Sequence, residues 1–242
     1  MKTMIDNRMK IHVEGKSTIT LRDTPSEMSL KGDKEYEVII LHGFKSSSKS
    51  VIKMAKKINS WGYPVIARDH LGHGARKNDG KVTDFLGMVS EINSFINTRK
   101  NVILIGDSLG GMFSLILGWL NPHIKQVFAI SSVSGIIDDN HVKRLEFLFN
   151  VKFTRMKNEY SGFLPRNLLK CKLENEDKFF LIHCKTDSIM PFEEFEENKR
   201  MLCIPDENTL VINKISGIGW LDHILIKNDK RTMNFIKNKI KR

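Results

Sequence analysis

Short apolar runs alternate with helical patterns along the chain from Tyr36 onward. The run 37–41 is rich in β-branched residues and ends at His42-Gly43, so it predicts a buried strand. After it, Val51, Met54 and Ile58 recur at helical spacing. The same alternation continues to the C-terminal region, and it is typical of parallel βαβ units. The predicted strands cover 37–41, 64–68, 101–106, 124–130, 178–184 and 209–213, and the predicted helices cover 48–61, 84–97, 109–120, 191–201 and 224–240.

Two regions depart from this rhythm. Residues 9–13 and 18–21 alternate between apolar and polar positions, which predicts a leading antiparallel hairpin. Residues 134–177 form an insertion of about 40 residues, much longer than an ordinary αβ connection. We therefore expect one α/β domain over residues 1–242, with a mostly parallel sheet of about eight strands and helices on both faces. A small cap at about 134–177 is expected between strands 6 and 7 of this sheet.

Composition narrows the classes of protein that fit. No apolar run approaches the roughly 18 residues that a membrane-spanning helix needs, and the N-terminus lacks the apolar core of a signal peptide, so we expect a cytoplasmic protein without a transmembrane segment. Cys171, Cys184 and Cys203 are widely spaced, which favours reduced thiols over disulfides or a zinc site. The net charge of +11 would suit a nucleic acid or an anionic membrane. Because the basic residues are spread along the chain, we expect a solvated basic surface and no specific nucleic-acid partner.

The segment Gly106-Asp107-Ser108-Leu109-Gly110 matches the pattern G-x-S-x-G. It follows a predicted buried strand directly and opens an apolar helix, which is the context of a nucleophile elbow. The sharp turn presses the backbone close to its neighbours, so glycines are needed at both ends, and the serine hydroxyl is pushed out at the helix N-terminus. The alternative is a glycine-rich turn in which Ser108 only caps the helix.

A serine hydroxyl is a weak nucleophile until a base takes its proton, and the base needs an acid to orient it. His223 lies after the last predicted strand, where a loop meets the final helix, and Asp187 follows the penultimate strand. The chain order Ser108, Asp187, His223 is that of α/β-hydrolases. The sequence therefore predicts these three residues as the catalytic triad. The other acids that remain open are Asp222, which adjoins His223, and Asp138 and Asp139, one strand earlier.

The loop after the first parallel strand, His42-Gly43-Phe44, is placed to supply the other half of an oxyanion hole. We expect the backbone N–H groups of Phe44 and Leu109 to converge on the substrate carbonyl oxygen. His42 is expected to fix this loop through hydrogen bonds. His70 and His73 have a spacing that metal ligands can use, but their glycine-rich loop favours a structural role, and no metal site is predicted.

Several of these motifs occur together in a known family. Leu41-His42-Gly43-Phe44, Asp69-His70-Leu71-Gly72-His73-Gly74 and Asp79-Gly80, with the elbow, resemble the α/β-hydrolase superfamily, and within it the feruloyl (cinnamoyl) esterases, monoacylglycerol lipases and related small carboxylesterases. The resemblance runs from about Val38 to the C-terminus. It implies an α/β-hydrolase fold, a compact cap and ester hydrolysis. One departure is Asp107, because the residue before the nucleophile is commonly His in such enzymes.

The expected function is a serine carboxylesterase that forms an acyl-enzyme on Ser108 and needs no cofactor. Its expected substrate is a small-molecule ester with a short acyl, monoacylglycerol or aromatic group, and its expected state is a monomer or homodimer. An acyl-thioesterase or lysophospholipase would use the same triad, and a non-catalytic α/β-hydrolase-like receptor is a third alternative. The residues predicted to line the substrate pocket are Phe44, Leu145, Phe149, Phe163 and Ile189.

Overall fold

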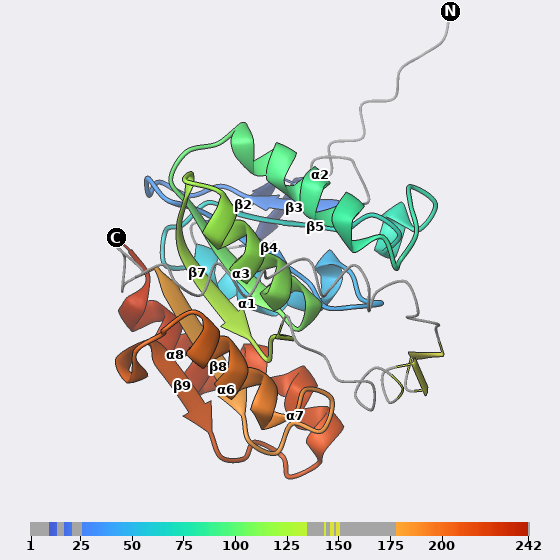
Figure 1. Ribbon diagram of the computed structural model, residues 1–242. Helices are drawn as coiled ribbons and strands as arrows, with labels where there is room; N and C mark the ends of the chain where they lie inside the picture. Colours follow the sequence, from blue (N-terminus) through green and yellow to red (C-terminus); the bar gives the residue numbers. More distant parts are fainter. Residues whose placement is uncertain are drawn as a thin grey trace, which may run out of the picture.

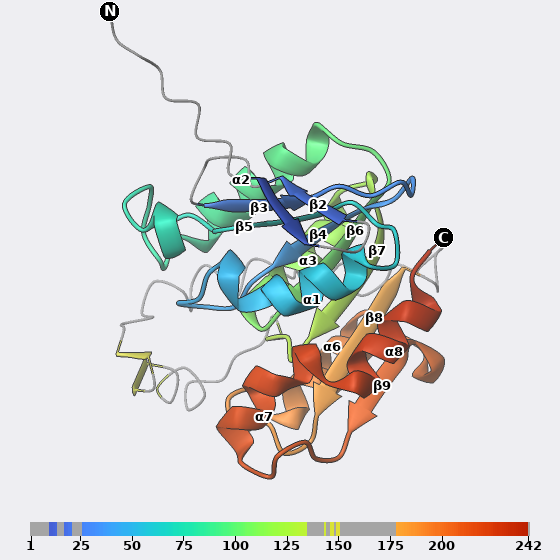
Figure 2. The same cartoon turned by 180° about the vertical axis from the view of Figure 1, so that it is seen from behind.

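The computed structural model describes residues 10–13, 17–20, 26–134, 143, 146, 147, 149, 150 and 178–241. Within these residues, nine strands form one sheet in the order β1-β2-β3-β5-β4-β6-β7-β8-β9 (Figures 1 and 2). The strands are β1 (Lys10–Val13), β2 (Ser17–Thr20), β3 (Glu27–Leu30), β4 (Glu37–Leu41), β5 (Val65–Arg68), β6 (Val102–Asp107), β7 (Ile124–Ile130), β8 (Phe179–Cys184) and β9 (Thr209–Ile212).

The strands from β5 to β9 in this order are parallel, and β1, β2 and β3 extend the sheet in antiparallel fashion. β6 lies in the middle and is buried along its whole length, as expected of a near-continuous apolar strand covered on both faces. In a parallel sheet all carboxyl ends lie at one edge. The loops that follow β4, β6 and β8 therefore lie at the same edge, where α/β folds bind their ligands.

Helices cover both faces of the sheet, and alternate residues of each strand face one layer or the other. Ile39 and Leu104 pack with α2, α3 and α6, whereas Ile40 and Ile103 pack with α1 and α8. Figures 1 and 2 show these two layers from opposite sides. The helices are α1 (Ile52–Asn59), α2 (Phe85–Asn97), α3 (Leu109–Leu120), α6 (Phe192–Met201), α7 (Gly219–Leu225) and α8 (Lys230–Lys239), with short 3-10 turns η1 (Ser48–Val51), η2 (Gly74–Arg76), η4 (Asp206–Asn208) and η5 (Ile226–Asn228).

The predicted sheet with helices on both faces is confirmed, and two details of the prediction are wrong. The strand β3 was not predicted, and with it the described sheet has nine strands, in keeping with the expected number of about eight; its alternation is regular, with Met28 and Leu30 buried, but it covers only four residues. The predicted helix 224–240 is divided into α7, η5 and α8. The break occurs at Asp229, which has an extended backbone and whose carboxylate accepts the N–H of Arg231 as an N-cap of α8.

The predicted cap at about 134–177 lies outside the described residues, apart from Ser134 and five positions between 143 and 150. The fallback acids Asp138 and Asp139 and the thiol of Cys171 lie outside them as well. Cap and domain boundaries therefore remain predictions.

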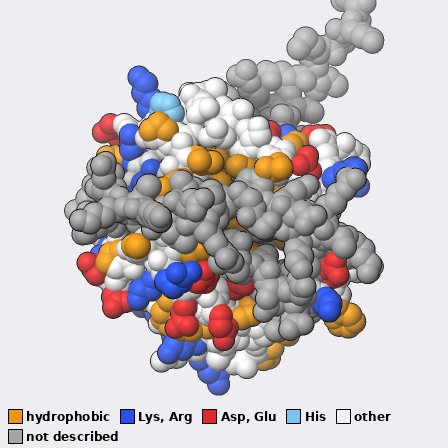
Figure 3. All heavy atoms as spheres, in the orientation of Figure 1, with side chains coloured by type: hydrophobic (Ala, Val, Ile, Leu, Met, Phe, Trp, Pro, Cys, Tyr) orange, Lys and Arg blue, Asp and Glu red, His pale blue; other side chains and the backbone are white. Residues whose placement is uncertain are grey.

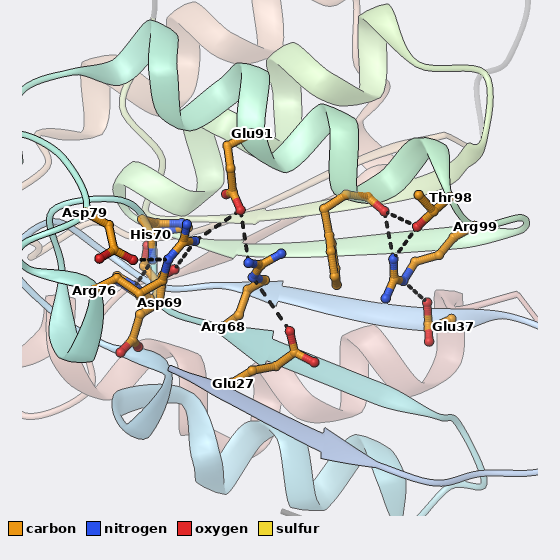
Figure 4. A network of polar contacts seen from close by, with 12 residues as sticks. Glu27, Glu37, Arg68, Asp69, His70, Arg76, Asp79, Glu91, Thr98 and Arg99 are labelled. Atoms are coloured by element: carbon orange, nitrogen blue, oxygen red, sulfur yellow. Dashed lines mark hydrogen bonds and ion pairs between the residues drawn. The ribbon is translucent and has the colours of Figure 1, made fainter. Parts of the chain in front are cut away.

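A chain of ion pairs ties the antiparallel extension to α2 and to the loop after β5 (Figure 4). Arg68 on β5 contacts Glu27 on β3 and Glu91 on α2, with nitrogen-to-oxygen distances of 3.7 and 3.0 Å. Arg76 reaches the same Glu91 at 3.1 Å and Asp79 at 3.2 Å. Single exposed pairs contribute little, but a shared network fixes the relative placement of the elements it joins. The loop 69–80 is thereby fastened to α2.

The turn from β6 into α3 packs tightly against the end of β4. A Cβ added to Gly110 would lie 2.2 Å from the carbonyl oxygen of Leu41, and a Cβ added to Gly106 would lie 2.1 Å from the carbonyl oxygen of Gly110. No side chain fits at such distances, so both glycines are required by close backbone approach rather than by a special φ.

This packing predicts the effect of Gly110→Ala. In a helix Ala is ordinarily more stable than Gly by about 1 kcal/mol, so a local view predicts stabilisation. We expect the opposite, a loss of about 3 kcal/mol or more in the free energy of unfolding, because the β4 backbone must move. Urea denaturation measures it. Gly80→Ala is the matched control, since its nearest contact would be Leu71 Cβ at 3.3 Å, and a comparable loss in both variants would contradict the prediction.

Candidate active site

Ser108 occupies the strained turn between β6 and α3. Its backbone has φ 56° and ψ −115°, a conformation that residues other than glycine rarely adopt. Its N–H donates to the carbonyl oxygen of Ile130 at 2.8 Å, which continues the β6–β7 pairing into the turn. Its side chain makes no capping hydrogen bond to α3, so the alternative of a simple N-cap serine is not what the structure shows. The geometry is that of a nucleophile elbow.

His223 and Asp187 lie side by side at the carboxyl edge of the sheet. The His223 Nδ1 is 2.7 Å from Asp187 Oδ2, and the second oxygen, Oδ1, accepts the backbone N–H groups of Ile189 and Met190, each at 2.9 Å. Burial alone would raise the pKa of Asp187, but the hydrogen bond and charge of His223 outweigh it, with help from Met190, and hold that pKa below its usual range. When Nδ1 donates to this carboxylate, Nε2 of the neutral ring is left as the acceptor nitrogen.

A close contact between two loops makes this pairing possible. A Cβ on Gly219, the first residue of α7, would lie 2.5 Å from Ser188 Cβ and 2.8 Å from the carbonyl oxygen of Thr186. Glycine at this position lets α7, which carries His223, approach the loop that carries Asp187. His183 on β8 supports the same loop, because its Nε2 lies 3.1 Å from the carbonyl oxygen of Met190.

Asp222, the competing acid beside His223, has other partners. Its carboxylate accepts hydrogen bonds from the Thr186 hydroxyl and from the Ser216 N–H at 2.6 Å, and it is fully buried. Burial opposes its ionisation, yet the hydrogen bonds from Ser216 and Thr186 outweigh this effect and hold the pKa of Asp222 well below its usual range. Asp222 therefore fastens the start of α7 to the loop after β8, and Asp187 is the carboxylate bonded to His223.

The two predicted oxyanion donors lie on segments that flank Ser108. Leu109 is the first residue of α3, directly after Ser108. A Cβ on Gly43 would lie 3.3 Å from Ser108 Cβ, so the loop containing Phe44 runs beside the candidate nucleophile. The position suits an oxyanion hole, and the role of the Phe44 and Leu109 N–H groups remains a prediction.

Three buried histidines hold this loop. The rings of His42 and His70 lie 4.0 Å apart between centroids, and His73 lies 5.4 Å from His42. His42 Nδ1 lies 2.8 Å from the carbonyl oxygen of Gly43, and its Nε2 accepts the N–H of His70 at 3.1 Å, which fixes the tautomer with the proton on Nδ1. Among the described residues, no three His, Cys, Asp or Glu side chains form a group suited to a metal ion. These histidines have hydrogen-bonding roles.

Two of the predicted pocket residues are in contact with each other. The rings of Phe44 and Phe149 are 5.3 Å apart and edge to face, and the Lys45 ammonium donates to the Phe149 carbonyl oxygen at 2.6 Å. Ile189 is partly buried and packs against the same apolar cluster as both rings. Leu145 and Phe163 lie outside the described residues, so their role stays a prediction.

One pair of buried charges was not predicted. The ammonium of Lys227 on η5 lies 2.5 Å from Oδ2 of Asp107, the residue before Ser108, and both side chains are buried. The sequence offered one signal, since Lys227 stands four residues after His223 and thus lies on the same side of a helix. Nothing in the sequence connected it to Asp107, 120 residues earlier.

The described surface carries charges of both signs. On the face shown in Figure 3, Lys and Arg side chains are interspersed with Asp and Glu side chains. In the part of the chain that the structure describes, no helix combines the length and the apolar character needed to cross a bilayer.

Comparison with known families decides the class. Residues 32–190 match the family model of the serine aminopeptidases S33, a family of hydrolases, and this match spans more than half of the chain. The chain belongs to this family. A lipase-esterase related protein from Clostridium acetobutylicum has the same α/β-hydrolase fold, with a TM-score of 0.60 and 20% identity over 88% of this chain and 98% of that one. The predicted fold and hydrolase class are thus confirmed.

Two curated relatives are esterases by name. A carboxylesterase of Bacillus subtilis is 25% identical over 152 residues, which cover 60% of this chain and 58% of the relative. A monoglyceride lipase homolog of monkeypox virus is 31% identical over 119 residues, covering 46% of this hydrolase and 42% of the viral protein. The chain therefore matches roughly half the length of these relatives.

The histidine cluster predicts how stability depends on pH. Burial lowers the pKa of His42 from 6.5 to about 4 and lowers that of His70 well below its ordinary value. The unfolded chain therefore binds more protons below pH 6.5, and stability present above that pH is lost as pH falls toward 4. We expect the melting temperature to fall by roughly 5 °C or more between pH 7.5 and 5.

The slope of melting temperature against pH shows whether the buried histidines cause this loss of stability. His70→Gln should lower the overall melting temperature but flatten its dependence on pH. His123→Gln, at a partly exposed position outside the cluster, should leave the wild-type slope unchanged. A melting temperature that stays constant from pH 7.5 to 5 in the wild type would contradict the prediction.

Proposed function

We propose that this α/β-hydrolase is a serine carboxylesterase with Ser108 as nucleophile, His223 as base and Asp187 as orienting acid. The observation that supports it most is the combination of a strained elbow at Ser108 with the 2.7 Å hydrogen bond between His223 and Asp187 at the same sheet edge. The elbow places the Ser108 hydroxyl at a helix N-terminus, and the paired histidine keeps Nε2 available as a proton acceptor.

The proposed reaction has two steps. Ser108 Oγ attacks the ester carbonyl carbon while His223 Nε2 takes the hydroxyl proton, and the resulting oxyanion is stabilised by the N–H groups of Phe44 and Leu109. The tetrahedral intermediate collapses, the proton passes from His223 to the leaving alcohol, and an acyl-enzyme remains. Water then attacks the acyl group with His223 again as base, which releases the acid and restores Ser108.

Two observations favour esters with an apolar acyl or aromatic group. Relatives of this chain include a carboxylesterase, a monoglyceride lipase homolog and a caffeoylshikimate esterase of Arabidopsis thaliana. The edge-to-face rings of Phe44 and Phe149 offer an apolar surface at the loop that flanks Ser108. The family description names aminopeptidases, and acyl transfer to an amine uses the same machinery, so amides belong in the test.

The first test is hydrolysis of p-nitrophenyl esters from acetate to palmitate, beside amino-acid p-nitroanilides and an acyl thioester. We expect ester turnover to exceed amide and thioester turnover, and Ser108→Ala to lower kcat by about 1000-fold or more. Ser114→Ala is a matched control, because Ser114 is a buried serine on α3 whose hydroxyl bonds the Gly110 carbonyl. A folded wild type that is inactive on every ester would sink the proposal.

A second test separates the two neighbouring acids. Asp187→Asn should lower kcat by roughly 100-fold or more while the melting temperature changes little, because Asn reverses the hydrogen bond that sets the His223 tautomer. Asp222→Asn should show the opposite balance, with a larger loss of melting temperature than of kcat, because its carboxylate fastens α7. Equal effects of the two substitutions on kcat would contradict the assignment of Asp187.

A further inference from the structure

The ion pair between Asp107 and Lys227 is unusual because both charged groups are buried. Side-chain exposure is 5% for Asp107 and 10% for Lys227, so both charges have left water. Replacing a buried ion pair by apolar residues is often neutral or stabilising, so stability alone does not explain such a pair. The second carboxylate oxygen, Asp107 Oδ1, is buried and has no hydrogen-bond partner among the described residues. Because burying these charges and this oxygen costs free energy, we expect the pair to have a functional role.

The two partners stand next to the two groups that exchange a proton in the proposed reaction. Asp107 is bonded directly to Ser108 at the end of β6, and Lys227 lies one helical turn after His223, since α7 continues into η5. The pair is therefore a direct tie between the elbow and the segment that carries His223. The other observed tie of that histidine leads to Asp187, on a different strand.

The charge of Asp107 also acts on the reaction. A lone carboxylate beside Ser108 would stabilise a protonated His223 but would oppose the negative oxyanion that forms on the substrate. The ammonium of Lys227 at 2.5 Å cancels most of this field. The titratable groups that surround these positions from the packed elements are Asp187 and His183 from β8 and its loop, Asp222 on α7, and His42 on the loop after β4.

We propose that Lys227 and Asp107 are positioning residues, which hold the helix of His223 against the nucleophile elbow and keep the charge beside Ser108 neutral. This inference rests on the proposed serine-esterase function. It assigns a role to the acidic residue that here replaces the more usual histidine before the nucleophile. Neither residue touches the substrate in this role; both act through Ser108 and His223.

The test uses Lys227→Met, Asp107→Asn and the double variant, with Lys227→Arg as the conservative replacement and Lys230→Met as a control on an exposed lysine three residues later. Two rates are measured from pH 5 to 9: labelling of the serine by a fluorophosphonate probe, and hydrolysis of a p-nitrophenyl ester. Labelling reports the reactivity of Ser108 whatever the natural substrate is.

Opposite shifts are the expected signature. Lys227→Met leaves the negative charge of Asp107 unpaired, which favours protonation of His223. The acidic limb of the rate profile should therefore shift to higher pH by roughly half a pH unit or more. Asp107→Asn leaves the positive charge of Lys227 unpaired, so the acidic limb should shift to lower pH. The double variant should return to the wild-type limb but keep a kcat lowered by roughly 10-fold with little change in KM, because the tie is lost. Lys227→Arg should restore the wild-type profile, and Lys230→Met should match it.

A purely structural pair would behave differently. Single variants that shift the limb in the same direction, or not at all, would overturn the proposal, as would a double variant with wild-type kcat. If a single variant fails to fold, the double variant and Lys227→Arg decide by the same criteria. Activity or labelling that survives Ser108→Ala would instead refute the proposed function itself, so the two failures are distinguishable.

Discussion

The close approach of the β6–α3 turn to the end of β4 is the constraint on which the rest of the site depends. Because Gly106 and Gly110 carry no side chain, the turn lies directly against Leu41 and the loop that follows it. The turn forces Ser108 into a backbone conformation with φ 56°, and such strain persists only where the surrounding packing determines it fully. Here that packing comes from β4 and β7, which flank β6 in a fully buried part of the sheet. The reactive geometry is thus a consequence of strand order and of two missing side chains.

A second set of contacts brings the remaining candidate residues to the same edge. The carboxyl ends of β6 and β8, which flank β7, lie on one side because the strands are parallel, and this places Ser108 and Asp187 at the same edge of the sheet without any special interaction. His223 reaches Asp187 from farther along the chain through local contacts at the start of α7. Gly219 allows α7 to touch the loop after β8, and Asp222 locks that contact through buried hydrogen bonds. The sheet brings Ser108 and Asp187 to the same edge, and the contacts at the start of α7 set the position of His223 beside Asp187.

This difference between the sheet and the local contacts explains what could be predicted from the sequence. Long apolar strands and the elbow motif are local signals, so the parallel sheet and the position of Ser108 followed from the pattern of residues. β3 was missed because its alternation, although regular, covers only four residues. The division of the final helix at Asp229 was missed because the apolar stripe continues across the break. The tie between Asp107 and Lys227 joins residues 120 positions apart, and no local pattern reports such a contact.

Three buried carboxylates at this edge each have hydrogen-bonded partners, although the whole chain carries a net charge of +11. Asp187 is paired with His223, Asp107 is paired with Lys227, and Asp222 is satisfied by hydroxyl and N–H donors. Burial favours the neutral form of His42, on the loop after β4, and lowers its pKa to about 4. The proposed chemistry creates one new cation and one new anion at this edge. Because the surrounding carboxylates already have partners, the field that would stabilise the proposed oxyanion is expected to come mainly from the predicted backbone N–H donors and the N-terminus of α3, which is how preorganised sites stabilise developing charge.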